Sequence, residues 1–190
     1  MQIQEQQTLY SQFERRLRAA GGESHYAGSL EEAARLIAEH PALTEKLIML
    51  PPGFAQREPW GSLLPLLEAR GITLEEAEGP REIADAPAGL SDAHLAIAET
   101  GSVLVAENNL AARAVTMLTI AHFVLVQARE LYPMLESAGE RLRQLSTPGS
   151  GQQHHMTLVT GPSRTADIER TLTIGVQGPR VFCVLFVESN

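Results

Sequence analysis

The stretch MTLVTGPSRTADIERTLTIGVQGPRVFCVLFVE, residues 156–188, holds the pattern that decides the fold. An apolar run at 156–159 stops at Thr160-Gly161-Pro162, and a short polar segment, 163–165, follows it. We expect this segment to open an amphipathic helix, after which a Gly- and Pro-containing turn returns the chain to a strand at 181–187. The stretch therefore predicts one strand–loop–helix–strand unit.

The loop of this unit gathers residues that suit an anion: Gly161, Ser163, Arg164 and Thr165. A helix N-terminus presents unpaired N–H groups and partial positive charge, so it favours a phosphate or carboxylate. The Arg164 guanidinium and the two hydroxyls would add hydrogen bonds to such a ligand. The alternative is that Ser163 or Thr165 only caps the helix, with Asp167 answering its dipole.

The rest of the chain extends the same alternation of strands and helices. Apolar runs predict further strands at 46–50, 72–74, 103–106 and 122–127. Periodic stretches predict helices at 63–69, 110–118 and 130–145, with a short helix or turn at 92–98. Strands without apolar–polar alternation, such as 122–127 and 181–187, suit a sheet that is covered on both faces. We predict an α/β protein, a three-layer α/β/α sandwich with a mainly parallel sheet.

Residues 1–42 are predicted as an N-terminal helical arm, and residues 43–190 as the α/β domain. Leu9, Phe13 and Leu17 recur at four-residue spacing in an amphipathic helix that ends at Gly21-Gly22. Ser29-Leu30-Glu31-Glu32 has the spacing of a capping box and predicts the start of a second helix.

Composition limits the classes of partner. A net charge of −8 argues against a nucleic-acid or anionic-membrane surface, because both need clustered Lys and Arg. No stretch approaches the ~20 apolar residues of a membrane span, and the N-terminal residues lack the pattern of a signal peptide. We therefore expect a cytoplasmic protein with no membrane insertion and no nucleic-acid partner.

The single cysteine, Cys183, lies within an apolar run. We expect one cysteine to exclude an intrachain disulfide and any cysteine-ligated iron–sulfur cluster or zinc site formed by this chain alone. We expect a buried structural thiol.

The six histidines do not predict a metal site. His154 and His155 are adjacent, so they would point to opposite faces of an extended segment. His25, His40 and His94 are isolated in the sequence, and His122 begins an apolar strand as a core or edge residue. The dinucleotide and phosphate-loop glycine motifs are absent as well. We predict no metal and no cofactor.

A second candidate site is the segment 97–102, Ile-Ala-Glu-Thr-Gly-Ser. Glu99, beside Thr100, Gly101 and Ser102 where a turn enters a strand, is a candidate nucleophile or general base. The alternative is that Glu99 holds the turn by accepting backbone N–H bonds, with Gly101 supplying an unusual φ. The residue types alone leave both interpretations of Glu99 open.

Two of these segments also resemble a known family. IAETGSVLV (97–105) and TGPSRTADIERTLTIGVQGP (160–179) are similar to the most recognisable segments of the LutC/YkgG family, whose members carry the lactate-utilisation (LUD) domain. The resemblance covers about residues 88 to 187. It implies an α/β/α fold like that of the glucosamine-phosphate deaminase, ribose-phosphate isomerase and CoA-transferase group (NagB/RpiA/CoA-transferase-like).

The resemblance also implies a function: a subunit or accessory protein in the oxidation of L-lactate to pyruvate. Its partners would be two iron–sulfur lactate-utilisation proteins, LutA- and LutB-like. With Cys183 alone, this chain would itself lack redox centres, so electron transfer would take place in the partners.

An independent enzyme is the alternative function. Class I CoA transferases use the glutamate of a Ser-Glu-Asn-Gly segment as nucleophile, and Ala98-Glu99-Thr100-Gly101 shares its Glu and Gly. In this alternative the chain binds or converts a phosphorylated or carboxylated metabolite. Glu99 would act as base or nucleophile, and Ser163, Arg164 and Thr165 would clamp a small anion. Whether the two loops meet is left open by the sequence.

Overall fold

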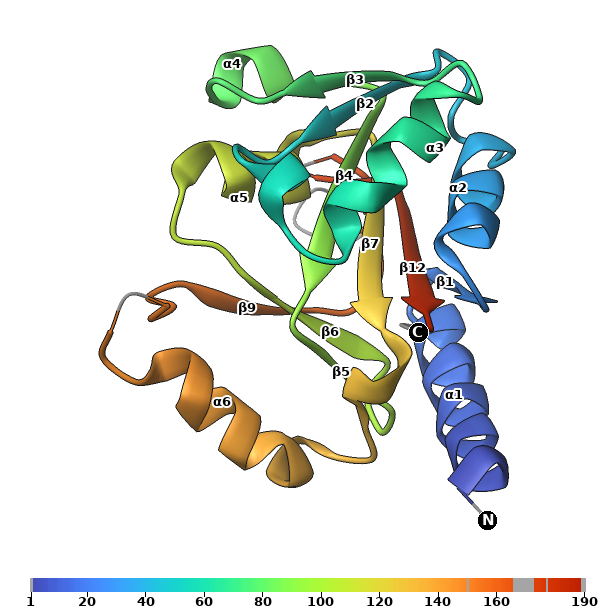
Figure 1. Cartoon of the computed structure of the whole chain (residues 1–190), viewed down its shortest axis with the longest axis vertical. Coiled ribbons are helices and arrows are strands. Elements are labelled where there is room, and N and C mark those ends of the chain that lie inside the picture. The colour runs from blue at the N-terminus through green and yellow to red at the C-terminus, as the bar shows by residue number, and fades with distance from the viewer. Residues whose placement is uncertain (1, 150, 166–172, 177, 189–190) are drawn as a thin grey trace.

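The computed structural model describes residues 2–149, 151–165, 173–176 and 178–188. Within these ranges the centre is a six-stranded sheet in the order β1-β12-β7-β4-β2-β3, and all its neighbouring strands run parallel (Figure 1). In that order the strands are Glu23–Ala27, Val181–Val187, Ala121–Gln127, Ala88–Ala93, Leu47–Leu50 and Thr73–Glu76. The predicted parallel sheet is confirmed.

Helices cover both faces of this sheet, which confirms the three-layer α/β/α arrangement. Side chains of β7 alternate between the faces: Phe123 and Leu125 pack toward α2 (Leu30–Ala38) and α3 (Leu64–Glu68). Val124 and Val126 face the opposite layer, which includes α1 (Gln2–Ala19). On that side α5 (Leu110–Leu118) packs against β2. None of the described helices combines the length and the apolar character needed to cross a membrane.

A second sheet lies in the layer that contains α1. Its four strands, as far as the described residues show, have the order β8-β5-β6-β9, with bounds Leu131–Tyr132, Leu95–Ile97, Ser102–Ala106 and Met156–Val159. Strand β6 runs antiparallel to β5 and β9. Helix α6 (Gly139–Ser146) covers the side of this sheet that faces away from the six-stranded sheet (Figure 1).

The remaining described elements are short. They are the 3-10 helices η1 (Phe54–Gln56), η2 (Trp60–Leu63), η3 (Ala128–Glu130) and η4 (Leu135–Ala138), the helix α4 (Pro80–Ile83), and the strands β10 (Arg164–Thr165) and β11 (Thr173–Ile174).

The predicted strand–loop–helix–strand unit is wrong in two respects. Strand β9 joins β6 in the second sheet instead of lying beside β12, which fits its alternating exposure, because only one of its faces is covered. Arg164–Thr165 pairs as β10 with β11, so it does not form the first turn of a helix. The remainder of the predicted helix, 166–172, lies outside the described residues.

Two further predictions are corrected. The segment 92–98, predicted as a helix or turn, contains the end of β4 and all of β5, because burial in the two sheets overrides its alanine-rich propensity. Only the second half of the predicted helix 130–145 is helical, as η4 and α6. Pro133 favours extended backbone at Tyr132, whose carbonyl accepts the Ala98 N–H at 2.8 Å and so joins β8 to β5.

Helix α1 is held by its apolar face and by its C-terminal end. Phe13 is fully buried, and the centroid of its ring lies 4.8 Å from the ring centroid of Phe186 on β12. Gly101 has φ of 70°, and a Cβ there would lie 2.4 Å from the backbone nitrogen of Leu17. A Cβ on Gly161 would lie 2.8 Å from the carbonyl oxygen of Ala20. The helix therefore contacts both loops that the sequence singled out, and glycine permits the approach.

The close contact at Gly101 predicts a specific loss of stability. Gly101→Ala should combine left-handed backbone strain of about 1–2 kcal/mol with overpacking of about 1–3 kcal/mol. Gly71→Ala is the matched control, because Gly71 has φ of 77° and a Cβ there would meet no atom within 4 Å. Urea denaturation should show a larger loss for Gly101→Ala than for Gly71→Ala. Equal losses would contradict the packing of α1 against this turn.

Candidate functional site

A cavity of about 190 Å³ lies between α5, the second sheet and the loops that flank β12. Its wall is mostly apolar, with a few polar groups, as in small-molecule sites. Residues Val105 and Glu107 come from the end of β6, Arg113, Thr116 and Met117 from α5, and His155, Thr157 and Val159 from β9 and the residue before it. The loops and β12 add Gly161, Pro162, Ser163, Gly178, Pro179 and Phe182.

Arg113 is the cationic side chain that α5 offers to this cavity. Asn109 caps the helix by accepting the N–H groups of Ala111 and Ala112 at 2.7 and 3.3 Å, which positions the first turn. Arg113 and Thr116 are three residues apart and therefore share one face of the helix. The Arg113 guanidinium makes no hydrogen bond or ion pair with any residue that the structure describes, so it can bind an anion.

A buried ion-pair network adjoins the cavity. Arg57 Nη1 donates to Asp92 Oδ1 at 2.7 Å and to Glu107 Oε1 at 2.5 Å, and Nη2 donates to Glu107 Oε2 at 3.2 Å. Glu107 is 7% exposed. Burial lowers the pKa of Arg57, but the hydrogen bond that Arg57 donates to Glu107 and the charge of Asp92 outweigh this effect, so the pKa is raised overall. Arg57 thus holds the Glu107 carboxylate, and its one positive charge set against two carboxylates leaves this network with a net charge of −1.

A buried hydroxyl–imidazole pair lies behind the cavity wall. His122 Nε2 lies 2.8 Å from Ser91 Oγ, and its ring contacts that of Phe182, a lining residue, at 5.5 Å. The other ring nitrogen, Nδ1, is buried and has no partner among the described residues. Burial lowers the pKa of His122 to about 3, so the ring is neutral. The sequence predicted a core or edge residue here, and the side chain is fully in the core.

The two predicted loops do meet, because β6 and β9 pair with Val103 opposite Val159. The hydroxyls of Ser102 and Thr160 lie 2.5 Å apart, which joins the end of one loop to the start of the other. Glu99 is used structurally: its carboxylate accepts the N–H of Leu135 at 3.0 Å. Gly101 has a left-handed conformation. Both observations match the alternative in which Glu99 accepts a backbone N–H and Gly101 supplies the unusual φ of the turn.

The predicted site residues divide between the cavity and its surroundings. Gly161 and Ser163 line the cavity. Glu99, Thr100, Gly101, Ser102, Arg164 and Thr165 do not line it. The Arg164 guanidinium lies against the end of α1, where a Cβ on Gly21 would be 3.0 Å from Nη2. Because Arg164 and Thr165 are in a strand, the helix dipole invoked for this loop does not act at these residues.

The charged residues in and beside the cavity were missed by sequence reasoning. Arg57, Asp92, Glu107 and Arg113 lie in four separate segments, and no motif spacing connects them. The one local signal was Asn109 before a periodic apolar stretch, which indicates the start of a helix but not what its first turn faces.

Comparison with known proteins identifies relatives of the chain. The family model of the LUD domain matches residues 62–187. Lactate utilization protein C of Halalkalibacterium halodurans is 28% identical over 119 residues, which are 61% of this chain and 52% of the relative. The protein of the same name from Shouchella clausii is 32% identical over 110 residues, 57% of this chain and 46% of the relative. The chain thus matches about half the length of these curated relatives.

A solved structure shares the fold. The crystal structure of a DUF162 family protein from Deinococcus radiodurans matches with a TM-score of 0.66 and 21% sequence identity. The match covers 96% of this chain and 98% of the other. The architecture described above is therefore one already seen by crystallography.

Removal of Arg57 should strongly destabilise the protein. Arg57→Met leaves Asp92 and Glu107 buried without their cation, a change that costs about 3–5 kcal/mol in comparable networks. Arg35→Met is the control, because Arg35 forms an exposed ion pair with Glu39 that is worth at most about 1 kcal/mol. Chemical denaturation at neutral pH measures both. A loss below 1 kcal/mol for Arg57→Met would contradict the network.

His122 should make stability depend on pH in the acid range. Its folded pKa of about 3 lies below the ordinary value of 6.5, so only the unfolded chain binds the proton between these values. Stability is therefore full above pH 6.5 and falls as the pH drops below it, by about 1.4 kcal/mol at pH 5.5.

Denaturation of the His122→Gln variant between pH 7.5 and 5.5 tests this dependence. The variant should lose less stability over this interval than the unaltered chain, by about 1.4 kcal/mol. His154→Gln, in the exposed surface loop, should keep the original profile. An unchanged profile for His122→Gln would show that this ring does not carry the effect.

Proposed function

The chain belongs to the LUD domain family, and from that membership we propose that it serves L-lactate utilisation as a carboxylate-binding subunit without redox centres of its own. Its curated relatives are named for lactate utilization. The proposal assigns the carboxylate to the cavity beside α5 and the electron transfer to partner proteins.

The observation that carries this proposal is the position of Arg113. Arg113 lines the cavity, and within the described part of the chain its guanidinium has no hydrogen-bond or ion-pair partner. A guanidinium matches a carboxylate in geometry and charge. Thr116 and Thr157 line the same wall, and the Thr157 hydroxyl suits the hydroxyl or keto oxygen of a 2-hydroxy or 2-keto acid. The Thr116 hydroxyl donates to the Arg113 carbonyl at 2.8 Å, so it can only accept from a ligand. A volume of about 190 Å³ accommodates a small acid.

The chemistry of lactate oxidation explains why partners are needed. Conversion of L-lactate to pyruvate removes the hydrogen from C2 and the proton from the hydroxyl, so two electrons and two protons leave. Cysteine-ligated iron–sulfur clusters accept single electrons, and a chain with one cysteine cannot hold a four-cysteine cluster alone. We therefore assign the electrons to iron–sulfur partner proteins of the LutA and LutB type.

Calorimetric titration with L-lactate and with pyruvate tests the carboxylate site. The intact chain should bind at least one of them, and Arg113→Gln should weaken that binding roughly ten- to hundredfold, the range expected for a lost charged hydrogen bond. Arg129→Gln, which removes an exposed cation at the end of β7, should leave the affinity unchanged. Absence of binding by the intact chain, or equal affinity in Arg113→Gln, would contradict the assignment.

Deletion of the gene tests the role in the cell. Growth on L-lactate as the carbon source should fail, and the unaltered gene should restore it while the Arg113→Gln gene does not. Purification of the tagged chain from lactate-grown cells should recover iron–sulfur proteins. If the chain alone oxidised lactate with an artificial electron acceptor, the non-redox part of the proposal would be wrong.

A further inference from the structure

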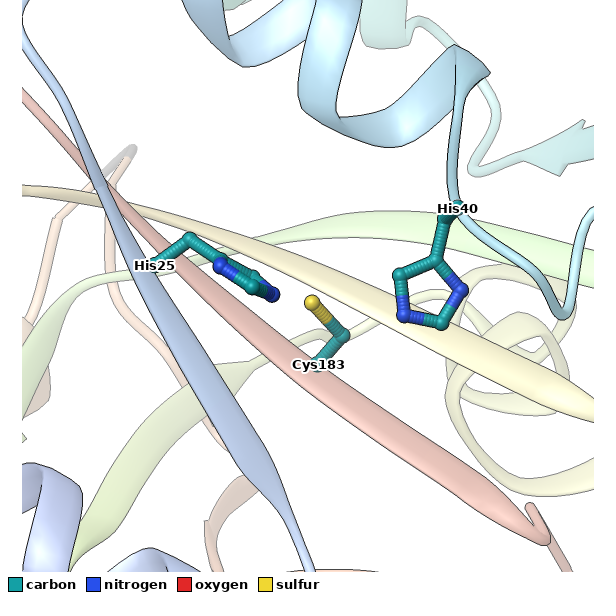
Figure 2. Close-up of side chains that lie close together, drawn as sticks. All are labelled: His25, His40 and Cys183. Atoms are coloured by element: carbon teal, nitrogen blue, oxygen red, sulfur yellow. The ribbon is translucent and has the colours of Figure 1, made fainter.

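Three ligating side chains converge on the opposite face of β12 from the cavity. His25 on β1, Cys183 on β12 and His40, just after α2, place their ligand atoms within 4.8 Å of one another. Figure 2 shows both imidazole rings turned toward the Cys183 sulfur from its two sides. The sequence treated His25 and His40 as isolated, and the structure corrects that: strand pairing and the return of the chain after α2 bring them together.

A carboxylate completes the group. Glu23 lies opposite Cys183 in the pairing of β1 with β12, two residues before His25 and so on the same face of the strand. Its Oε1 is 2.8 Å from His40 Nε2, and its Oε2 is 3.9 Å from His25 Nε2. The ligand atoms of two imidazoles and one thiol therefore converge, and a carboxylate lies beside both imidazoles.

We propose that Glu23, His25, His40 and Cys183 form a binding site for a divalent zinc-like metal ion. Nitrogen, sulfur and oxygen ligands in this combination suit Zn²⁺, which binds them tetrahedrally. Metal–nitrogen and metal–sulfur bonds of about 2.0–2.3 Å place neighbouring ligand atoms about 3.3–3.8 Å apart. The ligand atoms of His25, His40 and Cys183 lie within 4.8 Å of one another, so movements of these side chains, with a reorientation of Glu23, would close the site. One cysteine excludes a cysteine-only zinc site, but not one that histidines and a carboxylate complete.

Charge balance favours occupation by a divalent cation. Cys183 is buried, and burial disfavours its thiolate as long as no cation lies beside it. A hydrogen bond from His40 lowers the pKa of Glu23, so the carboxylate is ionised. A bound dication would displace one proton from the thiol, and thiolate, carboxylate and cation would then sum to zero net charge. The ion thus compensates a thiolate that the protein interior alone disfavours.

The site is reachable from solvent and anchored from within. The side chains of His25 and Glu23 are 39% and 44% exposed, whereas that of His40 is 10% exposed and Cys183 is buried. The His40 ring is held by an edge contact with Phe123 at 5.0 Å. A metal can therefore enter past the two exposed ligands and bind against the two fixed ones.

Two hydrogen bonds of His40 must change when a metal binds at Nε2, and the first is the 2.8 Å bond between Nε2 and Glu23 Oε1. In the empty site His40 Nδ1 accepts the N–H of Ala42 at 3.1 Å, which leaves the ring proton on Nε2. A metal at Nε2 moves that proton to Nδ1, so the Ala42 N–H must turn away. The loss of one neutral hydrogen bond and one to a carboxylate is small beside the free energy of a zinc–thiolate site.

Cobalt titration of the metal-stripped, untagged chain tests the site, because tetrahedral Co²⁺ reports its ligands by colour. One equivalent should bind with a thiolate-to-cobalt charge-transfer band, and Zn²⁺ should displace it and raise the melting temperature. His25→Ala, at a half-exposed position, should fold normally and weaken binding at least about a hundredfold, since even partners outside the ligand set cost ten- to a hundredfold. His154→Ala is the matched control and should bind as the unaltered chain does.

Two further variants separate a metal site from a merely structural cluster. Cys183→Ser should abolish the charge-transfer band, and Glu23→Gln should weaken binding while keeping the band. If the folded chain shows no thiolate band with Co²⁺, the proposal is overturned. It is also overturned if His25→Ala binds cobalt as tightly as the unaltered chain.

Discussion

The parallel pairing of β12 with both β1 and β7 is the constraint on which the rest of the structure depends. The seven residues of β12 lie between β1 and β7. Cys183, for example, is paired with Glu23 on β1 and with Phe123 on β7. Six of the seven are buried. Because successive side chains of a strand point to opposite faces, Phe182, Val184 and Phe186 face α1 and the cavity, while Cys183 and Leu185 face α2.

Much of the sheet could be predicted because its central strands are buried on both faces. Runs such as 122–127 and 181–187 are almost entirely apolar. At a length of five to seven residues, such a run is typical of a strand buried on both faces. The capped helix starting after Ser29 was also predictable, since the Ser29 hydroxyl accepts the N–H of Glu32 at 3.2 Å. Strand β1 was not, because Glu23 and His25 interrupt its apolar character.

The second sheet and the cavity depend on contacts between distant segments. Strand β8 has two residues and exists because β5 supplies its partner, so no local pattern could indicate it. The ion pair of Arg57 with Glu107 spans fifty residues, and the cavity needs both the end of β6 and the face of α5. The predicted loops were recognisable as unusual sequence. In the structure their glycines allow α1 to pack closely, and Glu99 accepts the N–H of Leu135.

The alternation along β12 also separates the two proposed sites. Phe182 forms part of the cavity wall, and the next residue, Cys183, belongs to the group on the other face. Strand β12 is hydrogen-bonded to both of its neighbours along its length. A side-chain substitution on one face of β12 therefore leaves the strand register unchanged, and the side chains on the other face keep their places. Arg113 lies on α5 and His25 on β1, and no residue of the cavity lining belongs to the metal group. A loss of carboxylate affinity and a loss of metal affinity can therefore each be traced to its own set of side chains.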